Sequence, residues 1–307
     1  MKVLVAGATG AVGRRLVPQL VERGHDVVGT TTSPAKFGLL HALGADAVQL
    51  NALVAVEVQD VVASTQPDAI VHQATALAGN TDLKHFDRTF ALTNRLRTEG
   101  TRNLLAAATA SGVERFVAQS YIGWNAGGAT EDAPLTGDPP ASQRQTLAAI
   151  EELESQVRDR GAALRYGSLY GPGASEELVE LIHKRAIPVI GDGAGVWSWL
   201  HVDDAASAAV AALECGARGV FNVVDDDPAP AADWLPALAA AVGAKQPRHI
   251  PVWLARRVAG DAVTRMMTDG HGVSNRKAKR ELGWEPRWSS WRDGFAHGLT
   301  DAEAVAA

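Results

Sequence analysis

The stretch Lys2–Arg23, KVLVAGATGAVGRRLVPQLVER, decides the fold. Its apolar start is typical of a short buried strand, and the run Arg14–Arg23 predicts a helix. Between them, Gly7, Gly10 and Gly13 have the spacing G-x-x-G-x-x-G. The first glycine allows a tight turn, the second leaves room for a phosphate, and the third lets the helix approach the strand. Because a helix N-terminus points unpaired N–H groups at an anion, the stretch predicts a pyrophosphate-binding loop.

Strand-like and helix-like runs alternate through the first half of the chain. The expected strands are 3–6, 25–30, 47–50, 69–72, 115–120 and 163–167, and the expected helices are 14–23, 34–43, 54–65, 86–111 and 145–160. This βαβ pattern predicts an α/β fold with a Rossmann-type, doubly wound parallel sheet.

The pattern changes after residue 170, where turns and short runs predict a small C-terminal α/β substrate lobe. Its expected elements include a strand over 197–202 and helices over 203–215, 231–242 and 252–268. We expect a dinucleotide-binding Rossmann domain over residues 1–170 and the lobe over 171–307, interwoven and without a clean linker. The lobe would cover the carboxyl edge of the sheet, where ligands of such sheets bind.

The composition excludes several classes of protein. The 307 residues are 46% hydrophobic and carry a net charge of −6, so we expect neither nucleic acid nor an anionic membrane as a partner. A single cysteine, Cys215, rules out an internal disulfide and favours a cytoplasmic location. No Cys/His cluster has the spacing of metal ligands, so no metal site is expected.

Six segments resemble, in order, the motifs of one enzyme family. They are VAGATGAVG (5–13), AIVHQAT (69–75), TEGTRNLL (98–105), LRYGSLYGPG (164–173), HVDD (201–204) and ELGWEP (281–286). Over nearly its full length the chain thus resembles the extended short-chain dehydrogenases/reductases, the NAD-dependent epimerase/dehydratase family. The resemblance implies a nicotinamide cofactor, and a homodimer formed through the helices 86–111 and 145–160. It also implies that the HVDD segment is structural, with its first Asp capping a helix.

The resemblance implies a cofactor pocket made by four separate parts of the chain. Asn51 stands where the family usually has Asp, and Tyr166 where Pro is usual. The implied contacts are Gly7, Thr9, Gly10, Ala11, Val12 and Gly13, then Asn51, Ala52 and Leu53, then Gln73, Ala74 and Thr75, and finally Tyr166, Gly167 and Ser168.

The end of the second strand bears on the choice between NAD and NADP. NAD-binding members of this fold tend to place an acid there, but the sequence reads GTTTS over 29–33. Hydroxyls and nearby cations would accept a 2′-phosphate, so NADP is favoured over NAD. The residues expected near this phosphate are Thr30, Thr32, Ser33 and Lys36, with Arg14 and Arg15 close by. The alternative is that residues 30–33 only cap the next helix.

The usual acid/base residues of the family are missing. Its Tyr-x-x-x-Lys pair, in which the Lys lowers the pKa of the Tyr, corresponds here to Gln143 and Leu147 or to Thr146 and Ile150. Its Asn in the preceding helix is replaced by Arg97.

Three explanations remain open. In the first, Ser120 and Tyr121, which fall where the family has its Ser/Thr, carry out the catalysis, and Arg97 or Arg144 supplies the positive charge. Alternatively, an activated substrate accepts hydride without a protein acid. In the third case, the chain is a non-catalytic dinucleotide-binding regulator.

Tryptophans suggest the kind of substrate. Trp124, Trp197 and Trp199, with Arg144, are the residues expected around a substrate pocket. Such a pocket favours hydride transfer to or from a small, fairly apolar carbonyl, alkene or hydroxyl compound. A sugar-type epimerase or dehydratase is the alternative, but residues 176–195 offer only Lys184 and Arg185 to a diphosphate.

Overall fold

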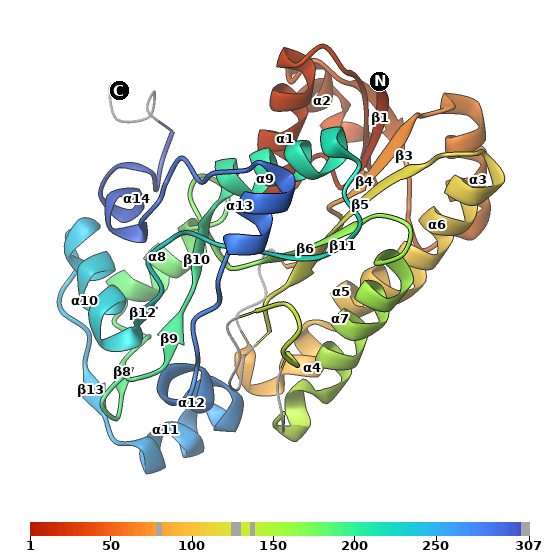
Figure 1. The fold of residues 1–307 in the computed structure, drawn as a ribbon. Coiled ribbons are helices and arrows are strands. Elements are labelled where there is room, and N and C mark those ends of the chain that lie inside the picture. Colours follow the sequence, from red (N-terminus) through yellow and green to blue (C-terminus); the bar gives the residue numbers. More distant parts are fainter. Residues whose placement is uncertain (78–81, 124–129, 136–138, 302–307) are drawn as a thin grey trace.

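One parallel sheet organises the chain, and the expected fold class is confirmed. The computed structural model describes residues 1–77, 82–123, 130–135 and 139–301. Seven parallel strands have the order β11-β6-β5-β4-β1-β2-β3 (Figure 1). They are Lys2–Ala6 (β1), Asp26–Thr31 (β2), Asp46–Gln49 (β3), Ala69–His72 (β4), Arg115–Tyr121 (β5), Ala162–Tyr166 (β6) and Gly219–Val223 (β11). Because all are parallel, their carboxyl ends meet at one edge.

Helices cover both faces of this sheet. One face packs against α1 (Ala11–Glu22), α2 (Phe37–Ala42), α9 (Val202–Cys215) and α13 (Arg276–Leu282), and the other against α3 (Ala55–Thr65), α6 (Thr101–Ala110) and α7 (Arg144–Val157). Successive side chains of β1 point to opposite faces of the sheet, so β1 contributes to both hydrophobic cores. Val3 and Val5 pack against the first set of helices, and Leu4 and Ala6 pack against the second.

The long helix expected over 86–111 is interrupted. It consists of α4 (Phe86–Thr89), α5 (Ala91–Arg95), a π-helical turn (Leu96–Gly100) and α6. A π turn changes which side chains face the sheet, and such turns recur at functional sites. Here Arg97 lies in the turn and is only 7% exposed.

The lobe is a separate core built around aromatic rings. Its helices are α8 (Glu176–His183), α10 (Ala231–Ala241), α11 (Val252–Val258), α12 (Gly260–Thr268) and α14 (Trp291–His297). Its short strands are β7 (Ser168–Tyr170), β8 (Val189–Ile190), β9 (Val196–Trp197), β10 (Trp199–His201), β12 (Ala229–Pro230) and β13 (His249–Ile250). Trp199, Trp234 and Trp291 are each at most 1% exposed in this core. The strand expected over 197–202 is therefore divided into β9 and β10.

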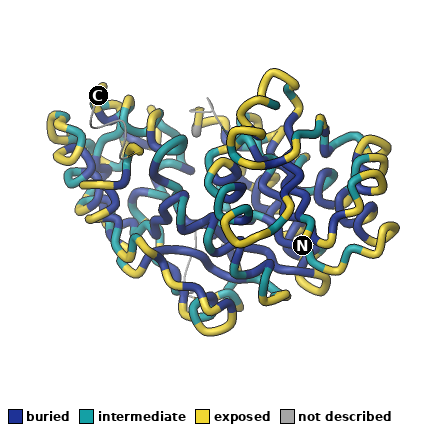
Figure 2. Tube along the Cα trace, turned by 90° about the horizontal axis from the view of Figure 1, so that it is seen from above, coloured by how far each residue is buried: buried dark blue, intermediate teal, exposed yellow. Residues whose placement is uncertain are grey.

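The chain crosses between sheet and lobe more than once. β11 and α9 lie beyond residue 170 and still belong to the sheet layers, while α14 returns to pack against α10. Figure 2 shows that buried residues run through both the sheet region and the lobe. Among the described residues, no helix has the length and apolar character needed to cross a bilayer.

Candidate cofactor and substrate site

The glycine-rich loop after β1 leaves an open cradle. Gly7 has a φ of +85°, and a Cβ there would lie 2.6 Å from the Ala74 nitrogen. A Cβ on Gly13 would lie 2.7 Å from the Cα of Ala8. At the exposed Gly10, in contrast, a Cβ would meet nothing closer than the Gly7 oxygen at 3.4 Å. Gly7 and Gly13 are thus required by close backbone contacts, whereas Gly10 borders free space.

The first turn of α1 is suited to an anion. Gly10 is its N-cap residue, no side chain caps the helix, and the first turn contains no acid. The N–H groups of that turn therefore face the space beside Gly10 without a competing carboxylate. This arrangement fits the pyrophosphate of a dinucleotide.

The segments after β2 and β3 lie beside this loop. The Ala8 nitrogen donates to the Thr30 oxygen at 3.2 Å, and the Leu50 nitrogen to the Thr31 oxygen at 3.0 Å. Asn51 accepts from the Leu53 nitrogen at 3.1 Å, so its side chain shapes its own turn. Thr30 is 2% exposed within the sheet, which corrects the expectation that its hydroxyl faces a ribose phosphate. Thr32 and Lys36 are exposed, and Ser33 is half-buried.

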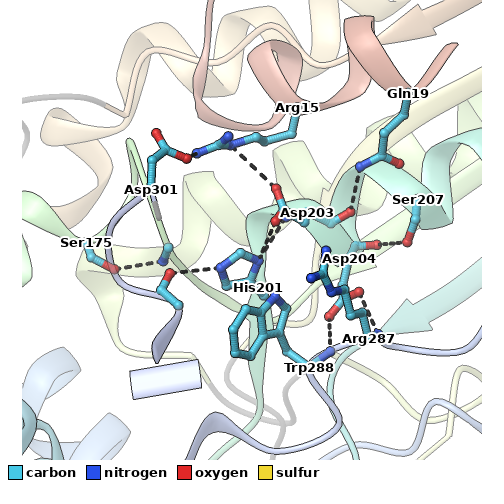
Figure 3. A network of polar contacts seen from close by, with 12 residues as sticks. Arg15, Gln19, Ser175, His201, Asp203, Asp204, Ser207, Arg287, Trp288 and Asp301 are labelled. Carbon is cyan, nitrogen blue, oxygen red and sulfur yellow. Dashed lines mark hydrogen bonds and ion pairs between the residues drawn. The ribbon is translucent and has the colours of Figure 1, made fainter. Parts of the chain in front are cut away.

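The two arginines of α1 contact residues from the second half of the chain. Arg15 forms ion pairs with Asp203, at 3.5 Å, and with Asp301 (Figure 3). Arg14 packs so closely against Gly173 that a Cβ at Gly173 would overlap its guanidinium. The expectation that Arg15 helps to hold a 2′-phosphate is therefore wrong, because its charge is used between α1 and the C-terminal segment.

The HVDD segment holds the C-terminal segment in place (Figure 3). His201, not the first Asp, is the side chain that caps α9, since its Nδ1 accepts from the Asp203 nitrogen at 3.1 Å. His201 Nε2 contacts the Gly298 oxygen at 2.9 Å. Asp204 accepts from the backbone nitrogens of Arg287 and Trp288 at 2.8 and 2.9 Å. The segment is structural, as expected, and among the described residues no Cys, His, Asp and Glu side chains group as metal ligands.

The side chain of Tyr166 lies in the core rather than at the sheet edge. It is 1% exposed, receives a hydrogen bond from Gln73 Nε2 and donates to the Ala205 oxygen, both at 3.1 Å. A Cβ on Gly167 would lie 2.6 Å from the Ser198 oxygen. Only the backbone of Tyr166 and Gly167, and the half-buried Ser168, thus lie at the edge where a nicotinamide would be held.

A cavity of about 600 Å³ separates the sheet edge from the lobe. Arg97, Tyr121 and Thr146 line it from the sheet side, and Asp82, Lys84 and Glu177 are its other charged lining residues. The remaining wall is apolar, formed by Leu77, Phe86, Phe90, Ala174, Leu178, Leu181, Ala186, Ile187, Pro188, Ile190, Trp197, Trp234, Ala259, Val263, Met266 and Met267. Such a cavity suits an apolar or aromatic ligand held by a few polar groups at one end.

Tyr121 and Arg97 meet at that polar end. The Tyr121 hydroxyl is hydrogen-bonded to the Ser168 side chain, and burial raises its pKa although the charge of Arg97 opposes this. Asn94 joins the group, since its Nδ2 donates to Thr146 Oγ1 at 2.9 Å and its Oδ1 accepts from Arg97 at 3.4 Å. At neutral pH the phenol therefore keeps its proton, and Thr146, one of the two residues that could correspond to the family's Tyr, lines the same cavity.

Three other site predictions need correction, and one lies outside the described residues. Ser120 points away from the cavity and donates to Glu154, which is paired with buried Arg165, both at 2.7 Å. Arg144 is exposed and does not line the cavity, and Trp199 lies behind its wall in the lobe core. Trp124 lies outside the described residues.

His72 connects the cofactor loop to the π turn. Its Nε2 is 3.2 Å from the Leu96 oxygen and its Nδ1 is 3.3 Å from the Ala74 nitrogen, so the neutral ring donates with one nitrogen and accepts with the other. Burial lowers its pKa from 6.5 to about 4. A proton on Nδ1 would oppose the Ala74 N–H, so protonation favours the unfolded chain.

We expect this histidine to make the fold sensitive to acid. The unfolded chain binds the proton below pH 6.5 and the folded chain only near pH 4, so stability is lost as the pH falls through this window. Between pH 7 and 4.5 the wild type should lose about 2 kcal/mol more unfolding free energy than His72→Gln. Urea unfolding of both proteins at the two pH values measures this. Identical pH dependence would show that His72 is not the responsible group.

Comparisons with known proteins agree with this geometry. A family model, the NAD dependent epimerase/dehydratase family, matches residues 3–223. A 3-diazoavenalumate denitrifying reductase from a Streptomyces species is 44% identical over 96% of this chain and 99% of that protein. A 2-alkyl-3-oxoalkanoate reductase from Stenotrophomonas maltophilia is 27% identical over 94% and 96%.

A solved structure shares the fold over nearly the whole length. It is a human epimerase family protein crystallised with NADPH, with a TM-score of 0.75 and 23% identity over 97% of this chain and 99% of that one. The expectation of a nicotinamide-dependent oxidoreductase is confirmed at the level of the family. The chain belongs to the NAD-dependent epimerase/dehydratase family of extended short-chain dehydrogenases/reductases.

Proposed function

We propose that the chain is an NADPH-dependent reductase of small apolar, aromatic-sized compounds. The observation behind this proposal is the 600 Å³ cavity, whose apolar wall ends at Tyr121, and Tyr121 is hydrogen-bonded to Ser168 at the edge where the nicotinamide is expected. When bound, the reduced nicotinamide supplies the hydride. Both reductases named above also act, by their names, on compounds with hydrocarbon parts rather than on sugars.

The choice of NADPH is supported by the end of β2. The exposed residues Thr32 and Lys36 offer a hydroxyl and a cation, with Ser33 half-buried between them. No acid follows β2 to accept from both hydroxyls of an unphosphorylated ribose. The human protein of the same fold was crystallised with NADPH.

The proposed chemistry gives Tyr121 the role of proton donor. A carbonyl that accepts hydride develops negative charge on its oxygen, and a neutral phenol beside it can supply the proton. Burial raises the pKa of Tyr121, so the proton is present at neutral pH. Ser168 holds the hydroxyl in place and offers a route for its reprotonation.

A second substrate chemistry follows from the 44% identical relative. Replacing a diazo group with hydride releases N₂, and that substitution needs no proton from a tyrosine. The missing Tyr-x-x-x-Lys pair is compatible with such an activated substrate. The dependence of turnover on Tyr121 distinguishes the two chemistries.

A sugar nucleotide fits the cavity poorly. Lys184 forms an exposed ion pair with Glu180, and Arg185 donates to the Gln246 oxygen. Neither residue lines the cavity. Among the described lining residues, the positive charges of Arg97 and Lys84 are balanced by the negative charges of Asp82 and Glu177, which leaves no net positive charge for a diphosphate.

We expect NADPH to bind more tightly than NADH and to quench tryptophan fluorescence. Trp197 lies beside Tyr121 and Ser168, near the expected nicotinamide position, so ring contact and energy transfer should lower its emission. Titration with each cofactor measures both affinities. If neither cofactor changes the fluorescence or the melting temperature, the cofactor proposal is wrong. Tighter binding of NADH would reverse only the stated preference.

Two expectations from the sequence stay predictions. One is the homodimer through the helices that begin near residues 86 and 145, which sedimentation can test. The other is the cytoplasmic location expected from the single cysteine.

A further inference from the structure

Arg97 is a buried cation that borders the cavity, and it forms no ion pair with any carboxylate among the described residues. Arg97 is 7% exposed, and its only hydrogen bond to a described residue runs from Nη1 to Asn94 Oδ1 at 3.4 Å. Burial lowers its pKa to about 10, so it stays charged at neutral pH. A guanidinium has five N–H donors, and a buried one is stable only where they are paired. Most of these donors therefore have no acceptor within the described part of the chain.

Two carboxylates are connected to Arg97, Glu154 through its charge and Asp87 through Thr146 and Asn94, and both already have other partners. Glu154 forms a two-point ion pair with Arg165 and also accepts from Ser120. Asp87 accepts from the backbone nitrogens of Gln145 and Thr146 at the start of α7. Among the described residues, no carboxylate lies within 4 Å of the Arg97 nitrogens.

The position of Arg97 points to a substrate rather than to the cofactor phosphates. The pyrophosphate cradle is the loop around Gly10, and the nearest atoms to a Cβ on Gly7, Gly10 or Gly13 belong to residues 7, 8, 73 and 74, not to Arg97. Arg97 comes instead from the π turn and faces the cavity with Tyr121 and Thr146. An anion at Arg97 would therefore lie near the proton donor of the proposed reduction.

We propose that Arg97 binds a carboxylate of the substrate next to the carbon that receives the hydride, so that the enzyme selects apolar or aromatic acids over neutral compounds. This inference rests on the proposed function, because it concerns the same cavity. The planar guanidinium matches the two oxygens of a carboxylate, and one cation matches one negative charge. The apolar part of the acid then extends towards Trp197 and Trp234.

Two cinnamic compounds of nearly equal shape test the charge selection. The full-length protein, saturated with NADP⁺ so that no turnover occurs, is titrated by calorimetry with trans-cinnamate and with its neutral amide, cinnamamide. We expect cinnamate to bind about tenfold more tightly or better, because the buried charge pair is formed only with the acid. Arg97→Gln should remove this preference while leaving NADP⁺ affinity unchanged, and Arg97→Lys should keep part of it.

The matched control is Arg102→Gln, since Arg102 is exposed, lies on α6 and pairs with Glu152 away from the cavity. Its preference should equal that of the wild type. Equal binding of acid and amide by the wild type, or a preference that survives in Arg97→Gln, overturns the role of Arg97 and leaves the proposed reductase standing. If neither compound binds, the cavity takes no aromatic ligand, and both proposals fail. The wild-type comparison and Arg97→Lys decide the question even if Arg97→Gln does not fold.

Discussion

Tyr121→Phe is expected to lower kcat about a hundredfold or more while leaving the affinity for NADPH unchanged. The substitution removes one oxygen that is hydrogen-bonded to Ser168 and keeps the ring that lines the cavity. Because the proton is transferred only in the transition state, kcat and kcat/KM should fall together. The measurement is NADPH oxidation with a carbonyl acid as substrate, beside a fluorescence titration of NADPH.

Tyr170→Phe is the matched control. It makes the same chemical change in a fully buried ring that does not line the cavity and whose hydroxyl has no partner among the described residues. We expect normal turnover, and a stability equal to or above that of the wild type. If turnover of Tyr121→Phe is also normal, the phenol is not the acid, and a substrate that accepts hydride without a proton, such as a diazo compound, becomes the better assignment.

Gly10→Val is expected to weaken cofactor binding about a hundredfold or more without unfolding the chain. Gly10 has a φ of −75° and a ψ of 175°, which valine readily adopts, and a Cβ would meet only the Gly7 oxygen at 3.4 Å. The isopropyl group would fill the space reserved for the pyrophosphate. Losing two charge-assisted hydrogen bonds, at about 1.5–2 kcal/mol each, should raise the Kd for NADPH about a hundredfold or more.

Two comparisons show whether this loss is local. The melting temperature of cofactor-free Gly10→Val should stay close to that of the wild type, whereas Gly13→Ala should lower it because its Cβ collides with the Ala8 backbone. Gly38→Ala, at an exposed helical site with nothing within 4 Å of the new Cβ, should bind NADPH normally. If Gly10→Val binds NADPH as tightly as the wild type does, the pyrophosphate of the dinucleotide does not bind at this loop.

The sheet and its phosphate loop could be predicted because their signals are local. The spacing of Gly7, Gly10 and Gly13 follows from contacts within one strand–turn–helix unit. The apolar runs mark parallel strands buried on both faces. The lobe was less predictable, because its short strands depend on distant partners: β9 pairs with β12 and β10 with β7.

The substrate site was predicted only in part, for geometric reasons. Ser120 and Tyr121 are adjacent on one strand, so their side chains point to opposite faces and only one can reach the cavity. Trp197 and Trp199 share a face by the same rule, and their rings stack 5.7 Å apart, but only Trp197 lines the cavity, because Trp199 is one layer deeper in the lobe core. Arg97 faces the cavity from a π turn, which the helical spacing of the sequence does not reveal.

The repeated crossing between sheet and lobe limits how this enzyme can be redesigned. A fragment ending at residue 170 would lack β11 and α9, leaving one edge of β6 and one face of the sheet open to water. Exchanging substrate preference with a relative therefore requires grafting several discontinuous segments, those around α8, around α10–α12 and at α14, while the intervening α9–β11 unit stays with its host.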